Sequence, residues 1–439
     1  MTRRTAGMSM ASFLITGAIA ASASLLAGAG VQDRPSPSSA AGQVPIFEPD
    51  PSWPKVPNNW VFGLVSDVFV DPQNHVWVLH RYRQVPADQK GRAAPPVLEF
   101  DTAGNFVQAW GGPGEGFEWP ATEHGISVDH RGFVWLGGSG GDDHHILKFT
   151  RDGKFVMQIG RRGQSKGNTD TRNVNRAADV MVYPKTNEVF VGDGYGNRRV
   201  IVFDADTGAF KRMWGGFGSA PTDPAPGQRV TGDDIREMVR LRDTGVADAE
   251  IIKTLKKEPD TIRELLVLPQ EGSRGPQQLI EAHSARVSND GYVYVCDGPA
   301  KRIQVFTVDG KFVNQLFINR GVKAPSTATG TVVERPRREV EDELYKHHET
   351  SGRLAISSDP AQRYLYVTDR SQQHIVVVDR KSLQVLGTVG GGPGRAPGQF
   401  YVLHGLSVDA QGNLYTAEVN AAGNRRAQKL VLKSMPAAK

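Results

Sequence analysis

Residues 283–317 read "HSARVSNDGYVYVCDGPAKRIQVFTVDGKFVNQLF", and hold four short apolar runs separated by turns that contain Asp, Asn or Gly. Short runs rich in Val, Ile, Phe and Tyr, bounded by such turn residues, are typical of β-strands joined by tight turns. The stretch therefore predicts four consecutive antiparallel strands, which is the pattern of one blade of a β-propeller.

The same pattern occurs six times along the chain, with a repeat of about 45 residues. The second strands of the six copies read HVWVLH from residue 75, FVWLGG from 133, EVFVGD from 188, YVYVCD from 292, YLYVTD from 364 and NLYTAE from 413. Six such blades close into a ring without leaving long unpaired strand edges. We predict an all-β protein, a six-bladed β-propeller whose repeats resemble the NHL type.

The two ends of the repeat region suggest how the ring closes. The last copy stops near residue 433 with its third strand, so a strand in VPIFEPDPSW, which begins at residue 44, is expected to complete that blade. The propeller is expected to span 44–433, and a short tail to follow at 434–439.

Two insertions interrupt the repeat. The first, at about 219–281, carries apolar residues at intervals of three and four after an Asp-rich start, which predicts one or two short helices between blades 3 and 4. The second, at about 321–350, is polar and interrupted by Pro. Either insertion could cover one end of the ring as a partial lid or be a surface decoration, and the sequence leaves both possibilities open.

The N-terminus has the pattern of a signal peptide. Arg3 and Arg4 precede the apolar run ASFLITGAIAASASLLAGAG, which ends in the small residues Ala27-Gly28-Ala29. We expect a signal peptide at 1–29, a flexible linker at 30–43, and a secreted or periplasmic mature protein, exported by either the general or the twin-arginine route. No cysteine lies near the expected cleavage point, so no membrane anchor is expected after cleavage.

Composition excludes several classes of site and partner. Cys296 is the single cysteine, which excludes an intramolecular disulfide and any multi-cysteine zinc or iron–sulfur site. The formal net charge of +5 is modest, and no basic cluster is interleaved with aromatic residues, so we do not expect nucleic-acid binding. A monomer is expected, because closed propellers are often monomeric.

An alternation at the start of the first strands is the strongest functional signal. Alignment of the six strands places one residue of each blade at the same level, next to the central channel. These residues are Ser66, His124, Ala178, His283, Gly352 and His404. Alternate blades of a six-bladed ring lie a third of a turn apart, so the three imidazoles should converge on one point of the axis.

Three neutral imidazoles with a fourth position open are the ligands of a catalytic metal site, for which zinc at about 2.0–2.1 Å is the default. Such ligands disfavour calcium and magnesium, but iron, copper and cobalt stay open. The alternative is that the histidines are hydrogen-bonded residues of the channel. The pairs His144-His145 and His347-His348 are interpreted as surface residues in loops.

Further motifs accompany the histidine strands HGISVD, HSARVS and HGLSVD, namely VFVGDGYGNRRVIVF from residue 189 and LHRYRQ from residue 79. Together they resemble peptidyl-α-hydroxyglycine α-amidating lyase, the propeller half of peptidylglycine α-amidating monooxygenase, over nearly all of residues 45–433. The resemblance implies that His124, His283 and His404 hold a catalytic zinc, that Tyr195 is the base and that Arg81 supports it.

The reaction of this family cleaves a carbinolamide into an amide and glyoxylate, so the substrate would be a small or peptide-derived molecule. In such chemistry zinc makes the substrate hydroxyl more acidic, and a tyrosine with a cation beside it removes the proton. Without the resemblance, Tyr195 could be a turn aromatic that covers a blade edge, and Arg81 could line the channel or form a salt bridge.

The chain departs from the family pattern at one position that concerns the substrate and at one that concerns a structural calcium. Gly298 stands where the family has a second substrate-binding arginine, so recognition of a substrate carboxylate is in doubt unless Arg370 of the fifth blade compensates. Gly405 stands where the family has the Asp that helps to hold a structural calcium, so no structural calcium is predicted.

Three functions remain open at this stage. The first is a zinc-dependent carbon–nitrogen lyase with Tyr195 as base. The second is another metal-dependent propeller hydrolase of the lactonase type, although such enzymes usually present carboxylate and Asn ligands, which this register lacks. The third is a non-catalytic NHL propeller that binds a protein or a glycan, because the fold alone does not separate these functions.

Overall fold

A computed structural model describes residues 44–267, 273–319, 350–419 and 425–436. The predicted signal peptide and linker at 1–43 lie outside the described residues, as do nearly all of the second insertion and the pair His347-His348. Within the described part of the chain, the strands form six four-stranded antiparallel sheets, which are the blades of the propeller.

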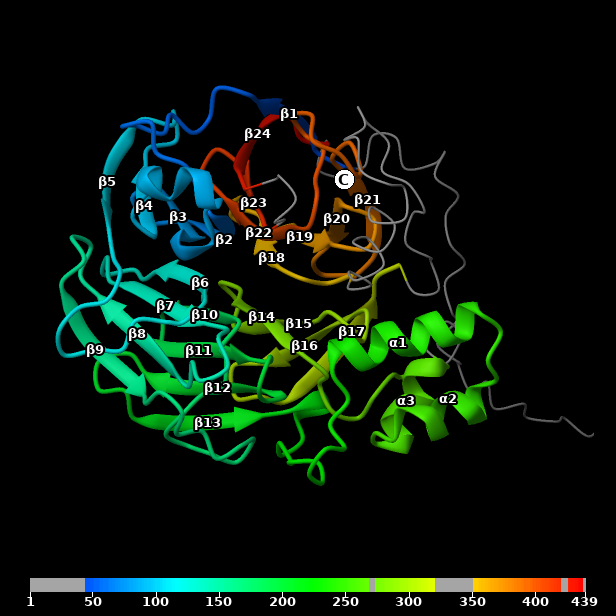
Figure 1. Ribbon diagram of the computed structural model, residues 1–439. Helices are drawn as coiled ribbons and strands as arrows, with labels where there is room; N and C mark the ends of the chain where they lie inside the picture. The colour runs from blue at the N-terminus through cyan, green and yellow to red at the C-terminus, as the bar shows by residue number, and fades with distance from the viewer. Residues whose placement is uncertain (1–43, 268–272, 320–349, 420–424, 437–439) are drawn as a thin grey trace, which may run out of the picture. The chain divides into compact units, whose positions relative to one another are not determined.

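The blades follow one another along the chain, and Figure 1 labels their strands. The first blade contains β2 (Leu64–Val70), β3 (Val76–Arg81), β4 (Val97–Phe100) and β5 (Phe106–Trp110). The second contains β6 (Glu123–Val128), β7 (Val134–Gly138), β8 (His145–Phe149) and β9 (Phe155–Gly160). The third contains β10 (Asp179–Tyr183), β11 (Glu188–Asp193), β12 (Arg199–Asp204) and β13 (Phe210–Trp214).

The other three blades have the same internal order. The fourth contains β14 (Ala282–Val287), β15 (Tyr292–Asp297), β16 (Arg302–Thr307) and β17 (Phe312–Phe317). The fifth contains β18 (Leu354–Ile356), β19 (Tyr364–Asp369), β20 (His374–Asp379) and β21 (Val385–Val389). The sixth contains β22 (Leu403–Val408), β23 (Leu414–Glu418), β24 (Ala427–Ser434) and the N-terminal strand β1 (Ile46–Asp50).

The inner strands β2, β6, β10, β14, β18 and β22 close a ring, because each contacts the inner strands of both neighbouring blades. The N-terminal strand β1 completes the last blade: it pairs antiparallel with β24 and so becomes the outermost strand of the sixth blade. The sequence predicts this arrangement, because the last repeat lacks its fourth strand. The predicted all-β six-bladed propeller is confirmed.

The hydrophobic core lies between neighbouring blades. One cluster joins Trp135 and Ile146 of the second blade to Val180 and Val191 of the third, all of them buried. The clusters of the other blades likewise combine adjacent blades, and in one of them Tyr415 of the sixth blade meets Val65 of the first. Alternation along each strand sends apolar side chains to both faces of a blade, so each blade packs against two neighbours.

The turn between the first and second strands carries a repeated hydrogen bond. An aspartate at the end of the first strand accepts a bond from an aromatic side chain six residues later, with distances of 2.9 to 3.0 Å. The pairs are Asp71 with Trp77, Asp129 with Trp135 and Asp409 with Tyr415. The polar atoms of these three buried aromatic residues therefore have partners, which compensates for their burial between blades.

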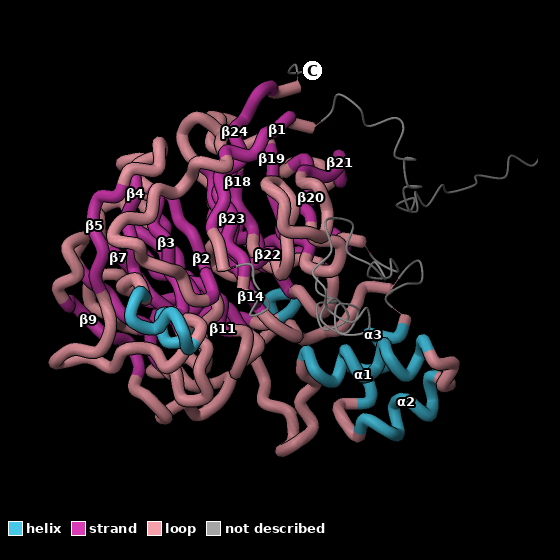
Figure 2. The backbone as a smooth tube through the Cα atoms, turned by 45° about the horizontal axis from the view of Figure 1, so that its top comes forward, coloured by secondary structure: helices cyan, strands magenta, loops and turns pink. Residues whose placement is uncertain are grey.

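The first insertion forms three α-helices within the described residues, rather than the one or two that the sequence predicts: α1 (Gly232–Asp243), α2 (Asp248–Leu255) and α3 (Pro259–Leu266). Thr231 and Asp234 form a capping box that begins α1. Figure 2 shows the three helices grouped together. Their apolar faces, with Ile235, Ile262 and Leu265, pack against Ile280 and Ala300 next to the fourth blade.

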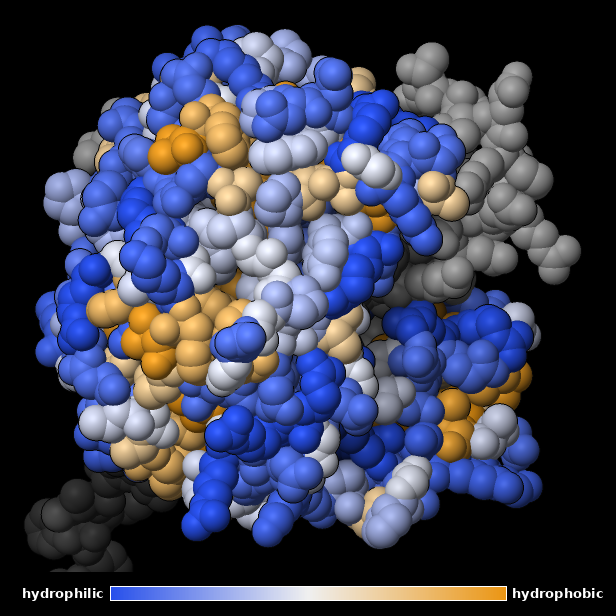
Figure 3. All heavy atoms as spheres, turned by 60° about the vertical axis from the view of Figure 1, so that its left-hand side comes forward, coloured by the Kyte–Doolittle hydropathy of each residue, from blue (hydrophilic) through white to orange (hydrophobic). Residues whose placement is uncertain are grey.

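Three short 3₁₀ segments complete the secondary structure of the described residues: η2 (Tyr82–Gln84), η3 (Ala87–Arg92) and η4 (Gly216–Gly218). None of the helices in the described residues has the length and apolar character needed to cross a bilayer. On the face drawn in Figure 3, apolar side chains form separate patches among hydrophilic ones. Cys296 is buried in the core between the fourth and fifth blades.

Candidate metal centre

The three histidines of the alternation meet at the centre of the ring. His124, His283 and His404 lie at the starts of β6, β14 and β22, and all three are buried. Their ligand atoms lie within 4.8 Å of one another, and their ring centroids are 4.7 to 5.2 Å apart. The structure therefore brings together the residues that the register of the inner strands places at one level.

Each of these histidines lies at a β-bulge. The pairing of β6 with β7 shifts between Glu123 and Gly125, and corresponding shifts surround His283 and His404. A bulge leaves one residue unpaired and redirects its side chain. Sequence reasoning locates the level of these residues but gives no sign of the bulges.

A backbone carbonyl of the following blade orients each imidazole. The Nδ1 atoms of the three histidines lie 2.6 to 2.9 Å from carbonyl oxygens of the small residues in the alternation. The pairs are His124 with Ala178, His283 with Gly352 and His404 with Ser66. A carbonyl oxygen only accepts, so each Nδ1 carries the hydrogen, and the lone pair of each Nε2 is available as a metal ligand.

The protonation state of the three histidines also suits metal binding. Burial lowers the pKa of His124, His283 and His404 well below the ordinary value, and the positive charges of Arg353 and Arg370 lower it further. The imidazoles are therefore neutral at pH 7, which is the form that binds a metal. Three neutral nitrogen donors fit zinc or another late transition metal better than calcium.

Tyr195 lies directly at this cluster. It belongs to the turn between β11 and β12, and its hydroxyl oxygen is 2.8 Å from Nε2 of His124 and 2.9 Å from Nε2 of His283. The guanidinium of Arg176 lies 5.5 Å from the centre of the tyrosine ring. The predicted base therefore stands beside two of the three predicted ligand atoms.

The buried carboxylate of Asp193 shapes the turn that carries Tyr195. Its Oδ1 accepts a hydrogen bond from the backbone N–H of Asn175, and its Oδ2 accepts from Nδ2 of Asn197 and from Nε of Arg199 at 2.7 and 2.8 Å. Asp193 and Arg199 form a fully buried ion pair. The last residue of β11 thus ties the turn to both neighbouring segments.

Arg81 stands at the end of β3, where the chain enters η2. Its Nε donates a hydrogen bond to the carbonyl oxygen of Glu123 at 3.1 Å, which places it next to the strand that carries His124. Burial lowers the pKa of Arg81, whereas the nearby Tyr195 and Glu123 favour its charged form. The charges of Arg81 and Tyr195 therefore lie close enough to interact.

A second layer of charged residues, which sequence reasoning missed, follows the histidine layer. Arg353 places Nη2 at 2.9 Å from Oδ2 of Asp67 and Nη1 at 2.8 Å from Oδ1 of Asp179, and all three side chains are fully buried. Asp67 also accepts a hydrogen bond from the backbone N–H of Ile126, and Asp179 accepts from Oγ of Ser284. This layer links blades 1 to 5 next to the histidines.

The sequence contained a signal for this second layer. The small residues of the alternation are each followed by a charged one, in Ser66-Asp67, Ala178-Asp179 and Gly352-Arg353. The histidines are followed by residues with small side chains, Gly125, Ser284 and Gly405. One residue after the histidine level, the large side chains therefore belong to blades 1, 3 and 5 and the small ones to blades 2, 4 and 6. The charged side chains of blades 1, 3 and 5 meet near the axis.

The structure shows what surrounds the two positions that depart from the family pattern. A Cβ atom on Gly405 would lie 2.8 Å from Cβ of Ala417 and 2.9 Å from Cα of Asp67, so this position has no room for a carboxylate side chain. Gly298 follows the last residue of β15. Arg370 is nearly buried at the end of β19, and a Cβ atom on Gly352 would lie 2.8 Å from its Nε.

One prediction about the other histidines is wrong. His145 is fully buried in β8 rather than exposed in a loop, and its Nε2 donates to the carbonyl oxygen of Glu118. Its neighbour His144 is partly buried and accepts a hydrogen bond from the N–H of Ser165. The burial follows from strand alternation, because His145 opens the third strand of the second blade.

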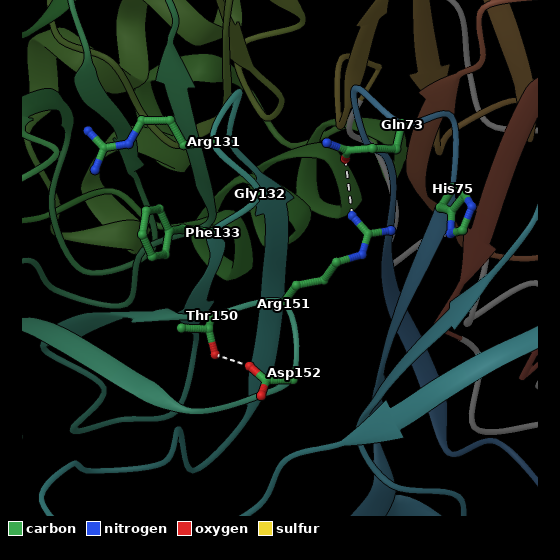
Figure 4. Close-up of a pocket in the computed structure, with 8 residues that line it drawn as sticks. All are labelled: Gln73, His75, Arg131, Gly132, Phe133, Thr150, Arg151 and Asp152. Carbon is green, nitrogen blue, oxygen red and sulfur yellow. Dashed lines mark hydrogen bonds between the residues drawn. The ribbon is translucent and has the colours of Figure 1, made fainter.

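A pocket of about 610 Å³ lies elsewhere, between hairpin turns of the first and second blades (Figure 4). Its lining includes His75 and Arg151, and none of the predicted site residues. Arg151 pairs with Asp71 at 2.7 Å and with Glu99, and His75 also pairs with Glu99. These turns join first to second and third to fourth strands, so they lie at the ends of the strands opposite to the Tyr195 turn.

Comparisons with known proteins agree with this description at the level of fold and distant relationship. No family model matches the chain. Peptidylglycine alpha-amidating monooxygenase of Rattus norvegicus is 25% identical over 388 residues, which cover 72% of this chain and 38% of that protein. NHL repeat-containing protein 3 of Homo sapiens is 24% identical over 271 residues, covering 60% of this chain and 57% of that protein.

The chain thus spans well under two thirds of the length of these curated relatives. Among solved structures, one described as a streptogramin B lyase structure aligns with a TM-score of 0.45 and 12% identity, covering 88% of this chain and 98% of that chain. The relatives support a distant relationship to the amidating monooxygenases and to NHL-repeat proteins.

Proposed function

We propose that this protein is a zinc-dependent lyase that cleaves the carbon–nitrogen bond of a carbinolamide, releasing an amide and an aldehyde such as glyoxylate. One observation carries the proposal: the hydroxyl of Tyr195 lies within hydrogen-bond distance of Nε2 of both His124 and His283, at the point where three neutral imidazoles converge. The distant similarity to peptidylglycine alpha-amidating monooxygenase supports it.

His124, His283 and His404 would hold the zinc through their Nε2 atoms. Zinc there supplies a Lewis acid that makes the substrate hydroxyl more acidic. The carbonyls of Ala178, Gly352 and Ser66 keep each ring in the ligating tautomer, because they accept the Nδ1 hydrogens.

Tyr195 would move the proton. As the phenolate it accepts the hydrogen of the substrate hydroxyl, the carbon–oxygen bond becomes a carbonyl as the carbon–nitrogen bond breaks, and the phenol then returns the hydrogen to the leaving amide nitrogen. Atoms and charge balance, and no co-reactant is consumed. Arg81 and Arg353, which both interact electrostatically with Tyr195, favour the phenolate over the phenol.

The donor set argues against a hydrolase of the lactonase type. Among the described residues, the group that can hold a metal consists of histidines alone. The nearby carboxylates of Asp67 and Asp179 are already paired, both with Arg353 and the second also with Arg286. We further propose that the protein is exported to the periplasm or the exterior, on the strength of the apolar run at 11–30. We propose that it acts there as a monomer, as closed propellers often do.

The proposal is tested first by elemental mass spectrometry of the purified protein. We expect about one equivalent of zinc in the wild type and in a His144→Ala control, and none in a His124→Ala, His283→Ala, His404→Ala triple variant. Absence of bound metal in the wild type, even after zinc is added, would exclude the zinc lyase.

Turnover is tested next, with an N-acyl-α-hydroxyglycine and with a carbinolamide that lacks the carboxylate. Aldehyde release is expected from at least one substrate, and it should fall sharply in Tyr195→Phe while the zinc content stays unchanged. Undiminished turnover in Tyr195→Phe would refute the role of the tyrosine. A preference for the substrate without the carboxylate would agree with Gly298 at the position of the missing arginine.

A further inference from the structure

The connection between the third and fourth blades reaches the turn that carries Tyr195. Arg229 lies just before α1, and its Nη2 donates hydrogen bonds to the carbonyl oxygens of Gly194 at 2.9 Å and Asn197 at 2.8 Å. These two carbonyls stand on either side of Tyr195 in the turn. A single guanidinium thus bridges the base of the turn from outside the blade.

A second contact joins the same insertion to the end of the turn. Oε2 of Glu258, the residue before α3, lies 2.6 Å from Nη2 of Arg198, whose side chain is 1% exposed. The backbone N–H of Glu258 donates to the carbonyl oxygen of Gln228 at 2.9 Å, which ties the start of α3 to the segment that carries Arg229. Both contacts therefore depend on the folded helical insertion.

The helices hold this segment through their own core. Val230, next to Arg229, is fully buried and packs in one cluster with Ile235, Ile262 and Leu265. Burial lowers the pKa of Arg229 to about 10, so the guanidinium stays charged at neutral pH. Because the guanidinium is charged, its hydrogen bonds to the two carbonyls are stronger than those of a neutral donor. Removal of the Arg229 side chain would therefore cost both carbonyls a strong hydrogen bond.

We propose that the helical insertion is a positioning element of the active site, in which Arg229, supported by Glu258, holds the turn so that the Tyr195 hydroxyl stays between His124 and His283. The geometric part stands by itself, and the effect on turnover rests on the proposed lyase function. Arg229 binds the backbone carbonyls of the turn, so it is a positioning residue and not a catalytic one.

Hydrogen–deuterium exchange tests the geometric part without any assumption about function. In Arg229→Ala, the peptide that covers residues 189–200 is expected to exchange at least severalfold faster than in the wild type. The matched control is Arg242→Ala, because Arg242 donates to Leu266 within the helical insertion and does not contact the turn. The control should loosen helical peptides and leave 189–200 unchanged.

Arg229→Lys covers the case in which Arg229→Ala unfolds the insertion altogether. Lysine keeps the charge and can reach one carbonyl, so protection of 189–200 should be partly restored. Unchanged exchange of 189–200 in Arg229→Ala, or equal loosening of this peptide in Arg242→Ala, would overturn the proposal.

Turnover provides the second arm, through a double-mutant cycle with Tyr195→Phe. Arg229→Ala is expected to lower kcat by about tenfold in the wild-type background, with the zinc content retained, because a displaced base is a poor catalyst. In the Tyr195→Phe background it should have little further effect. An equal loss in both backgrounds would show that Arg229 acts independently of Tyr195 and overturn the proposal. If the wild type shows no lyase turnover, the proposed function fails, and the exchange experiment still decides the positioning role.

Discussion

Nδ1 of His404, in the last blade, lies 2.6 Å from the carbonyl oxygen of Ser66, in the first blade, across 338 positions of sequence. The same contact links His124 to Ala178 and His283 to Gly352. Each imidazole is therefore oriented by the blade that follows its own around the ring. The hydrogen bond from His404 joins the last blade to the first, so all three imidazoles are oriented only when the propeller is closed.

Metal removal should destabilise the wild type and not a ligand variant. A ligand that binds only the folded state stabilises it by about 4 kcal/mol when its free concentration is a thousand times its dissociation constant. We expect a chelator to lower the Tm of the wild type and to leave the Tm of His404→Ala unchanged. Differential scanning calorimetry with and without chelator makes the comparison, and equal shifts in both proteins would contradict binding at this site.

Arg353→Met should strongly destabilise the fold. Burial raises the pKa of Asp67 to about 6 although Arg353 lies beside it, which indicates how costly the buried carboxylate is. Removal of Arg353 leaves two buried carboxylates with Arg286, the ion-pair partner of Asp179, as their remaining cation, and breaking such a cluster costs about 3–5 kcal/mol. Urea unfolding should show this loss.

Two further variants test the cause of that loss. The double variant Asp67→Asn, Arg353→Met should recover part of the free energy of unfolding, because the remaining carboxylate, that of Asp179, still pairs with Arg286 at 3.0 Å. Arg131→Met, which breaks the exposed pair with Asp206, should change stability by less than about 1 kcal/mol. Equal losses in Arg353→Met and in the double variant would attribute the effect to packing alone.

Arg81→Met should lower turnover and retain the metal. The buried guanidinium interacts electrostatically with Tyr195, so its loss should reduce kcat roughly ten- to a hundredfold. The neighbouring Arg83 is 39% exposed and pairs with Glu123, and Arg83→Met should stay close to the wild type. Steady-state kinetics with parallel zinc analysis separates the two; a similar decline in both variants would point to a disturbed loop.

His80 should make the protein sensitive to acid. Its side chain is fully buried, accepting a hydrogen bond at Nδ1 from the N–H of Gly63 and donating from Nε2 to the carbonyl of Pro95. Burial lowers the pKa of His80 from 6.5 to about 4. The neutral form is therefore stabilised by folding, and this contribution is present above pH 6.5 and is lost as the pH falls towards 4.

The expected loss between these limits is about 3 kcal/mol. A His80→Gln variant can make both hydrogen bonds and does not titrate. Urea unfolding at pH 7 and pH 4.5 should show that the wild type loses more stability than the variant over this interval. A constant difference between the two proteins at both pH values would mean that His80 does not titrate on unfolding in this range.

The fold could be predicted almost completely from the sequence, because each blade is encoded locally. Turn residues and alternating apolar runs recur in every copy, and an aspartate six residues before an aromatic residue marks the first hairpin of several blades. The sequence predicts too few helices in the first insertion. Apolar residues recur at helical spacing throughout it, and the turns at Thr244 and near Lys256 that divide the helices do not interrupt this spacing.

The candidate site could be predicted in part. The convergence of the three histidines could be predicted because the repeats supply a common register, and Tyr195 and Arg81 become candidates through a family resemblance. The charged layer of Asp67, Asp179 and Arg353 was missed, although the same register contains it. Arg229 lies in a connection without periodicity, so no pattern in the sequence points to it.

The sequence by itself determined the six blades, the missing strand of the last repeat and the alternation of histidine with small residues, since all of these are periodic properties of side chains. Only the tertiary structure decided which nitrogen of each histidine faces the centre and what holds Tyr195 in place. Backbone carbonyls decide both, those of Ser66, Gly194 and Asn197 among them. Because every residue has a carbonyl, the sequence does not show which ones act in this way. The direction of a carbonyl depends on the bulge, the turn and the neighbouring blade, and it becomes defined only when the ring closes.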